Sequence, residues 1–353
     1  MLHLLQMKKN QTLLIIEMKK TVLLFLIIFL PWAVYAQTDG TIVEQSICLP
    51  KPAVTYKRYV EAATNRYLQN KGDAMDSIQL QKPVDLSSRI LSPEEFERRQ
   101  SYTGIECLRI KYMSDGLKVV GYIWKPKNTE GKKLPVIIFN RGGNRERSKL
   151  EPWMADGFYE FVSNGFVVIG SQYRGVDGGE GKEEYGGADV HDVLNLIPLT
   201  TSLAYTDTNN VFMFGHSRGG MMTYLALKAG IPVNAAAVTS GVSDLFGNAE
   251  DHPELITTIY NQLIPDFNHR REEVLRERSA VHWVDKLNIP VIIMHGSADS
   301  SISAGRTLQL AQQLQEFGKP YQLVIYEGDD HGLFINRRDS DRRILEWFRK
   351  YMK

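Results

Sequence analysis

The sequence predicts an α/β fold, in which helices cover both faces of a mostly parallel β-sheet and an antiparallel hairpin opens the sheet. Over most of the chain, short apolar runs alternate with longer segments whose apolar residues recur at helical spacing. This alternation is typical of parallel strands joined by crossover helices. The first two runs, residues 105–113 and 117–124, are joined only by Ser114-Asp115-Gly116, a turn sequence that favours a hairpin.

The remaining elements follow in order along the chain. Buried strands are expected at residues 136–139, 166–170, 211–214, 235–238, 291–294 and 322–326, and helices near residues 150–163, 190–203, 219–229, 305–317 and 339–352. No low-complexity linker interrupts this region, so residues 105–353 are expected to form one domain. Residues 243–284 are inserted between two strands and are rich in charge and helical pattern. They are expected to form a cap over the functional edge of the sheet, and a remote decoration is the alternative.

Residues 37–104 are predicted to be a polar, helical extension that packs against this domain. Residues 56–68 have amphipathic spacing, and Ser92-Pro93-Glu94-Glu95 is a capping box for a short helix that ends near residue 100. The extension contains Cys48 and the domain contains Cys107, the two cysteines of the chain. A disulfide between them and two separate core thiols are both open interpretations.

Residues 1–36 have the features of a secretory signal region. Met18-Lys19-Lys20 is a positive segment, residues 21–30 are apolar, and Val34-Tyr35-Ala36 offers small residues for cleavage. The apolar stretch is short for a membrane span, so an uncleaved anchor is the weaker alternative. Met18 is a candidate start beside Met1, and we expect the mature protein to be periplasmic or secreted, without stable membrane insertion.

The composition is that of an ordinary globular protein. The 353 residues are 43% hydrophobic and 24% charged, with a formal net charge of +1. This length supports one large domain with a substantial core. The near-neutral balance gives no reason to expect nucleic acid as a partner.

One stretch carries a catalytic motif. An apolar run at residues 211–214 is followed by Gly215-His216-Ser217-Arg218-Gly219, and then by apolar residues at helical spacing. Strand, Gly-x-Ser-x-Gly and helix together define a nucleophile elbow. The serine of such an elbow stands on a crowded, strained turn, which is why both flanking positions are glycine. Ser217 is therefore predicted to be a nucleophile beside a helix N-terminus.

The partners of Ser217 are predicted from strand ends. Asp299 follows the strand at residues 291–294 and His331 follows the strand at residues 322–326, so both are expected at the carboxyl edge of the sheet. Serine needs a base to take its proton, and imidazole suits that role. Asp299 is expected to accept the other ring N–H of His331. The order Ser, Asp, His is that of the α/β-hydrolase fold, which is the predicted fold.

The developing oxyanion needs two donors. The backbone N–H of Arg218 is expected to be one. The other is expected from the loop after residues 136–139, where Arg141 and Gly142 are the candidates and the paired glycines let the backbone approach the substrate.

Other polar residues near these motifs have simpler interpretations. His216 is expected to pack within the turn, and His295 is expected to be structural. Asp329 and Asp330 are expected to be local loop or cap carboxylates, although replacement of Asp299 by one of them is the alternative.

The sequence predicts neither a metal site nor a cofactor. His191, Asp189 and Asp192 fall on different faces of the predicted helix, so they are not expected to share a metal. The glycine-rich loop at residues 175–187 lacks the spacing of a phosphate-binding loop. It is predicted to be a flexible surface loop near the site.

These motifs together resemble the catalytic domain of the prolyl oligopeptidase family of serine peptidases. The matching stretches are, in order, Arg141-Gly142-Gly143, Arg174-Gly175, Gly215-His-Ser-Arg-Gly-Gly220, His295-Gly296-x-x-Asp299 and Asp330-His331-Gly332. The resemblance covers about residues 105–353 and implies a triad of Ser217, Asp299 and His331. Arg141 stands where the family often has Tyr or His, which favours backbone donors in the oxyanion hole. Members with full peptidase architecture carry an N-terminal propeller, for which residues 37–104 are too few.

The sequence therefore predicts an exported serine hydrolase, a peptidase that cleaves short peptides through an acyl-enzyme. A carboxylesterase that acts on small-molecule or glycan acyl esters is the alternative, because one fold serves both reactions. A non-catalytic binding protein is disfavoured, because nucleophile, base and acid are all present. The oligomeric state is not predicted.

Mass spectrometry of the exported protein tests the signal region. We expect a mature chain that begins near Gln37, because the small residues of Val34-Tyr35-Ala36 follow the apolar run at the cleavage distance. Recovery of an intact peptide beginning at Met18 from the exported protein would contradict this expectation.

Overall fold

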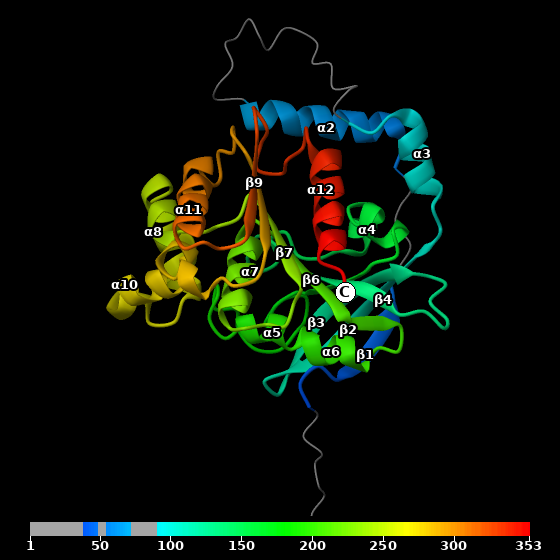
Figure 1. The fold of residues 1–353 in the computed structure, drawn as a ribbon, viewed down its shortest axis with the longest axis horizontal. Coiled ribbons are helices and arrows are strands. Elements are labelled where there is room, and N and C mark those ends of the chain that lie inside the picture. Colours follow the sequence, from blue (N-terminus) through cyan, green and yellow to red (C-terminus); the bar gives the residue numbers. More distant parts are fainter. Residues whose placement is uncertain (1–37, 49–53, 72–89) are drawn as a thin grey trace, which may run out of the picture. The chain divides into compact units, whose positions relative to one another are not determined.

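The computed structural model describes residues 38–48, 54–71 and 90–353, so the predicted signal region lies outside the described residues. A 9-stranded sheet runs through this part of the chain in the order β1-β2-β3-β5-β4-β6-β7-β8-β9 (Figure 1). Its strands are β1 (Ile42–Ile47), β2 (Ile105–Ser114), β3 (Leu117–Pro126), β4 (Leu134–Asn140), β5 (Val167–Ser171), β6 (Thr206–His216), β7 (Ala235–Thr239), β8 (Val291–Gly296) and β9 (Tyr321–Tyr326).

The strand directions confirm the predicted α/β-hydrolase-like architecture. β2 and β3 form the antiparallel hairpin, with Ser114 paired to Leu117 across the turn, and β3 is also antiparallel to β5. From β5 through β4 to β9, every neighbouring pair is parallel. The carboxyl ends of these parallel strands therefore share one edge of the sheet.

Helices connect the strands. They are α2 (Tyr56–Lys71), α3 (Pro93–Ser101), α4 (Tyr159–Ser163), α5 (Val190–Leu194), α6 (Leu196–Ser202), α7 (Arg218–Lys228), α8 (Leu245–Asp251), α9 (Asn261–Leu263), α10 (Phe267–Glu277), α11 (Ala304–Glu316) and α12 (Arg337–Lys350), with short 3₁₀ or π turns η2 (Pro152–Asp156), η3 (Ile256–Tyr260), η4 (Ala280–His282) and η5 (Val284–Lys286). Within the described ranges, none of these helices has both the length and the apolar character needed to cross a membrane.

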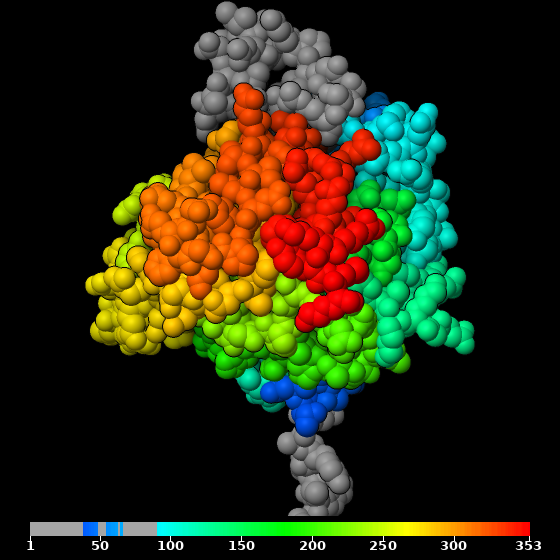
Figure 2. Space-filling model, in the orientation of Figure 1, coloured from blue at the N-terminus to red at the C-terminus, as the bar shows by residue number. Residues whose placement is uncertain are grey.

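Two apolar cores lie on the two faces of the sheet. One core joins the strands to α5, α6, α7, α11 and the inserted helices. The other core joins them to α4 and α12, through residues such as Phe161 and Phe348. In Figure 2, α12 is red, α11 is orange and the insertion is yellow, so elements from both cores are visible in one view. Coverage of both faces explains why the parallel strands are continuous apolar runs.

Two predicted helices are broken in the structure. The segment predicted at residues 190–203 divides into α5 and α6, because Pro198 has no N–H to donate to the Leu194 carbonyl four residues earlier. The segment predicted at residues 150–163 divides at Gly157, between η2 and α4. Helical spacing marked both segments correctly but did not locate the breaks.

The N-terminal extension was predicted to be helical, and this was incomplete. Helices α2 and α3 are present, and Ser92 caps α3 by accepting the backbone N–H of Glu95 at 3.2 Å. The extension also supplies β1, which pairs antiparallel with β2 at the sheet edge. Its mostly exposed residues give β1 no apolar run, which is why the pattern of the sequence did not reveal it.

A disulfide and partly buried ion pairs attach the extension to the domain. Cys48 is bonded to Cys107 directly after β1, which resolves the pairing that the sequence left open. The carboxylate of Glu95 in α3, only 8% exposed, accepts from Arg99 at 2.9 Å and lies 2.8 Å from Arg338 of α12. Arg99 also contacts Glu160 of α4 at 2.6 Å.

Removal of the disulfide should destabilise the protein. The bond closes a loop of 59 residues, and constraint of the unfolded chain on this scale is worth about 2–4 kcal/mol. We expect the Cys48→Ala, Cys107→Ala double variant to lose that much unfolding free energy in urea titrations. An equal urea midpoint for the wild type under oxidising and reducing conditions would contradict the prediction.

Candidate active site

Ser217 occupies a strained turn between β6 and α7. Its backbone has φ 58° and ψ −125°, a conformation that non-glycine residues rarely adopt. The N–H of Ser217 donates to the Thr239 carbonyl at 3.0 Å, and the N–H of Gly220 donates to the Ser217 carbonyl at 2.9 Å. These bonds hold the turn, so the side chain of Ser217 projects from the carboxyl end of β6 beside the N-terminus of α7.

The two glycines that flank Ser217 are required by close packing. A Cβ on Gly215 would overlap the backbone of Gly219 and the hydroxyl of Thr223. A Cβ on Gly219 would overlap the Asn140 carbonyl at the end of β4. The close approach of β4, β6 and α7 therefore requires the two glycines of the Gly-x-Ser-x-Gly pattern.

The structure brings the three predicted residues together at the shared strand edge. His331 Nε2 lies 2.9 Å from Ser217 Oγ, and His331 Nδ1 lies 2.8 Å from Asp299 Oδ2. The Asp299 side chain is fully buried, whereas His331 is 27% exposed. Both distances are those of hydrogen bonds, so one imidazole connects a partly accessible hydroxyl to a buried carboxylate.

The Asp299 carboxylate is held by four polar contacts. Its Oδ1 accepts the backbone N–H groups of Ser301 at 2.8 Å and Ile302 at 2.9 Å, and its Oδ2 faces His331 and also His295 at 2.9 Å. Burial raises the pKa of Asp299, but the hydrogen bonds from His295 and His331 lower it by more, so the pKa lies well below its usual range. Asp299 is therefore a fixed negative charge at neutral pH.

Asp329 and Asp330 are local loop carboxylates. Asp329 is fully buried and accepts the N–H of Ile335 at 3.0 Å and both the backbone and side-chain amides of Asn336 at 2.9 Å. Asp330 accepts the backbone N–H of Gly332 at 2.9 Å. Both carboxylates shape the loop that carries His331, and the imidazole of His331 lies 2.8 Å from Asp299.

The loop after β4 lies against the nucleophile. A Cβ on Gly142 would stand 3.1 Å from the Ser217 Cβ and 3.6 Å from its Oγ, so a glycine lets this backbone come close. The side chain of Arg141 is buried and donates to the carbonyls of Gln172, Gly142, Arg145 and Arg147. Arg141 and Gly142 can therefore donate only their backbone N–H groups to an oxyanion. The backbone N–H of Arg218, at the start of α7, is the other candidate donor.

The side chain of Arg218 forms a buried ion cluster that the sequence did not reveal. It is 2% exposed and is paired with Glu183 and, at 2.6 Å, with Asp189. It also donates to the Gly143 carbonyl at 3.1 Å, while Glu183 accepts the backbone N–H of Arg145 at 2.6 Å. The cluster thus connects the elbow to the candidate oxyanion loop. The sequence did contain a signal for this cluster. A buried arginine next to the nucleophile needs carboxylate partners, because an unpaired buried charge is costly.

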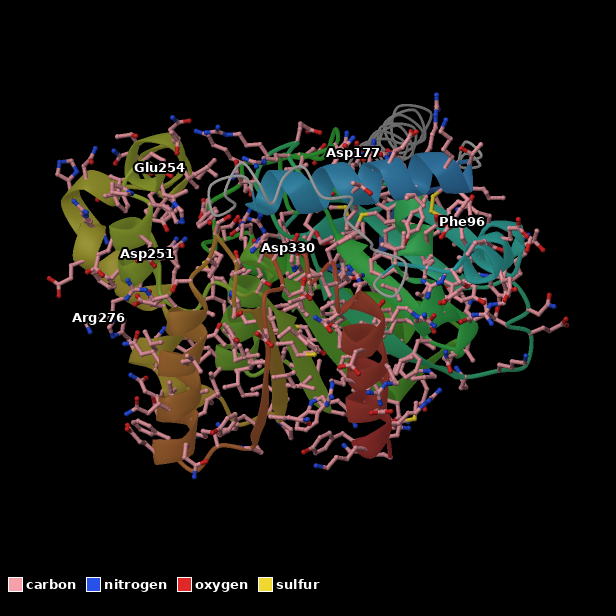
Figure 3. All side chains as sticks on the ribbon, turned by 90° about the horizontal axis from the view of Figure 1, so that it is seen from above. Phe96, Asp177, Asp251, Glu254, Arg276 and Asp330 are labelled. Atoms are coloured by element: carbon pink, nitrogen blue, oxygen red, sulfur yellow. A yellow bond between two sulfur atoms is a disulfide. The ribbon has the colours of Figure 1, made fainter. Side chains whose placement is uncertain are left out.

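The prediction of a flexible surface loop at residues 175–187 was wrong in part. Glu183 and Tyr185 are buried, and the Tyr185 ring lies 4.6 Å from the Arg218 guanidinium. This part of the loop is anchored because Glu183 and Tyr185 contact the buried guanidinium of Arg218. Figure 3 labels Asp177, at the start of the same loop.

The three residues weighed as metal ligands have separate partners. Asp189 binds Arg218, Asp192 binds Arg174 at 2.8 Å, and His191 Nδ1 faces Asp115 at 2.8 Å. Across the described ranges, no group of three or more His, Cys, Asp or Glu side chains is arranged to hold a metal ion.

The insertion between β7 and β8 contacts both loops beside Ser217. Gln262 accepts the side chain of Arg145 at 2.5 Å, and Arg278 donates to the Tyr185 carbonyl at 3.0 Å. The Tyr260 and Tyr185 rings are 5.7 Å apart. In Figure 3, Asp251, Glu254 and Arg276 mark the insertion on one side of Asp330, which neighbours His331.

Comparison with known proteins agrees with this geometry. The profile of the prolyl oligopeptidase family matches residues 153–353. The uncharacterized peptidase YtmA of Bacillus subtilis is 28% identical over 245 residues, which cover 69% of this chain and 92% of that protein. The acylamino-acid-releasing enzyme 1 of Oryza sativa subsp. japonica is 27% identical over 265 residues, which cover 68% of this chain and 33% of the rice enzyme.

Solved structures share the fold. The acylaminoacyl peptidase of Pyrococcus horikoshii aligns with a TM-score of 0.61 at 22% identity, over 75% of this chain and 45% of that one. The chain therefore spans less than half of this larger enzyme, although it spans nearly all of the Bacillus relative. The chain belongs to the prolyl oligopeptidase family and is a serine hydrolase.

Substitution of Asp299 tests the assignment of the acid. Asp299→Asn should lower kcat by about 10⁴-fold, because an amide facing Nδ1 favours the wrong tautomer of His331. Asp330→Asn is the matched control, since its side-chain oxygen still accepts from Gly332, and it should retain most activity.

Thermal unfolding must be measured on both variants, because loss of fold would mimic loss of catalysis. Near-normal turnover in Asp299→Asn, together with inactive Asp330→Asn, would assign the acid to the His331 loop instead.

Proposed function

We propose that this chain is an exported serine peptidase that cleaves short peptides through an acyl-enzyme on Ser217. The observation that carries the proposal is the alignment of Ser217 Oγ, His331 and Asp299 through contacts of 2.9 and 2.8 Å. In this mechanism His331 Nε2 takes the Ser217 proton as Oγ attacks the carbonyl carbon. The same nitrogen then protonates the departing amine, and water repeats the cycle to release the acid.

The residues around the triad support the charge changes of this reaction. The buried carboxylate of Asp299 stabilises the imidazolium that forms on His331 in both steps. Backbone N–H groups of Arg218 and of the loop at Arg141 and Gly142 receive the oxyanion. The insertion at residues 243–284 serves as a cap, which is supported by its contacts with Arg145 and Tyr185.

The choice of short peptides rests on the relatives. Several are named for small units, such as the rice acylamino-acid-releasing enzyme and the dipeptidyl-peptidase 5 of Porphyromonas endodontalis. Export is supported by the signal pattern of residues 18–36 and by the Cys48–Cys107 disulfide, because disulfides persist in oxidising compartments.

Two assays on the mature protein test this function. A fluorophosphonate should label Ser217 and leave Ser217→Ala unlabelled, because such reagents trap an activated serine beside an oxyanion hole. A matched panel of N-acetylated peptide anilides, free-amine dipeptide anilides and p-nitrophenyl esters then compares kcat/KM values.

We expect cleavage of anilides from at least one of the two peptide sets, since protonation of a poor amine leaving group is what the triad supplies. Hydrolysis of esters alone would identify a carboxylesterase and defeat the peptidase proposal. Labelling that persists in Ser217→Ala would show that the nucleophile has been misassigned.

A further inference from the structure

A second histidine contacts the carboxylate of the triad. His295 lies at the end of β8, four residues before Asp299, and is fully buried. Its Nε2 is 2.9 Å from Asp299 Oδ2, the oxygen that also faces His331 Nδ1 at 2.8 Å. One carboxylate oxygen is therefore shared by two imidazoles.

The surroundings of His295 determine which of its nitrogens carries a hydrogen. Nε2 faces Asp299 Oδ2 and also the Ile302 carbonyl at 2.9 Å, and both of these atoms are acceptors. Nε2 must therefore be a donor. Nδ1 faces the Thr307 hydroxyl of α11 at 2.7 Å, which donates to it in the neutral ring.

We propose that His295 is a positioning residue, whose Nε2–H fixes the Asp299 carboxylate in the orientation and with the charge density that His331 requires. The inference rests on the proposed function, because it assigns His295 a role in activating Ser217. Asp299 Oδ1 is already held by the backbone of residues 301 and 302. His295 completes this arrangement at Oδ2, so the carboxylate cannot rotate away from His331.

Two amide substitutions separate this role from simple packing. In His295→Gln the side-chain amide reaches the place of Nε2 and can still donate to Asp299. In His295→Asn the shorter amide reaches only the place of Nδ1, near Thr307, and the donor to Asp299 is lost. Both variants remain polar, so a purely structural role would affect them alike.

The readouts are the rate of fluorophosphonate labelling of Ser217, together with kcat and KM on the best substrate. His295→Asn should be slower in labelling and kcat by about 10- to 100-fold, because a hydrogen bond to a charged group has been removed. KM should stay unchanged, because His295 does not touch the substrate. His295→Gln should restore the rate of labelling and kcat towards wild type.

Several outcomes would overturn the inference. A folded His295→Asn protein with wild-type rates of labelling and turnover would do so, and so would a folded His295→Gln protein as impaired as His295→Asn. Nitrogen-15 NMR of the unmodified protein provides a test that needs no variant, since a hydrogen on Nδ1 with none on Nε2 contradicts the donor role.

The labelling assay also keeps this test apart from the test of the proposed function. Labelling of Ser217 without cleavage of any peptide would defeat the peptidase proposal and leave the role of His295 measurable. Absence of labelling in folded wild-type protein would overturn both.

Discussion

A buried positive charge beside the nucleophile constrains the loops around the active site. The guanidinium of Arg218 cannot remain unpaired in the interior, because an uncompensated buried charge costs about 3–5 kcal/mol. Glu183 and Asp189 compensate it, and the same groups contact Gly143 and Arg145 in the loop that faces Ser217. This electrostatic cluster therefore fixes the position of the candidate oxyanion loop relative to the elbow.

Parts of the chain that are distant in sequence meet at the same strand edge. β6, β8 and β9 end in the loops that carry Ser217, Asp299 and His331. Because these strands are parallel, their pairing brings the three residues to the same edge of the sheet. The N-terminal extension reaches this region too, because Ile90 packs with α2 against Phe334 in the loop of His331. Together with the inserted helices, the extension shapes the surroundings of a triad that the sheet assembles.

The sequence predicted a local feature well where the interactions that cause it lie within one short segment. The elbow is such a case, because Gly215 and Gly219 relieve clashes within a few residues of Ser217. The strands of the parallel sheet were predicted because burial on both faces makes each a continuous apolar run. β1 was missed because an edge strand with mostly exposed residues has no such run, and the break at Pro198 was missed because periodicity continues across it.

The fold class, the nucleophile and the chain order of its partners can be predicted from the sequence alone, because they depend on local periodicity and on the direction of successive strands. The assembled sheet selects among the alternatives that the sequence left open, since Asp299 faces His331 and Cys107 is bonded to Cys48. It also supplies the partners that the sequence did not reveal, Glu183 and Asp189 for Arg218. The physical reason is distance. Hydrogen bonds and ion pairs act over a few ångströms, and residues far apart along the chain come within that range only when the sheet has assembled.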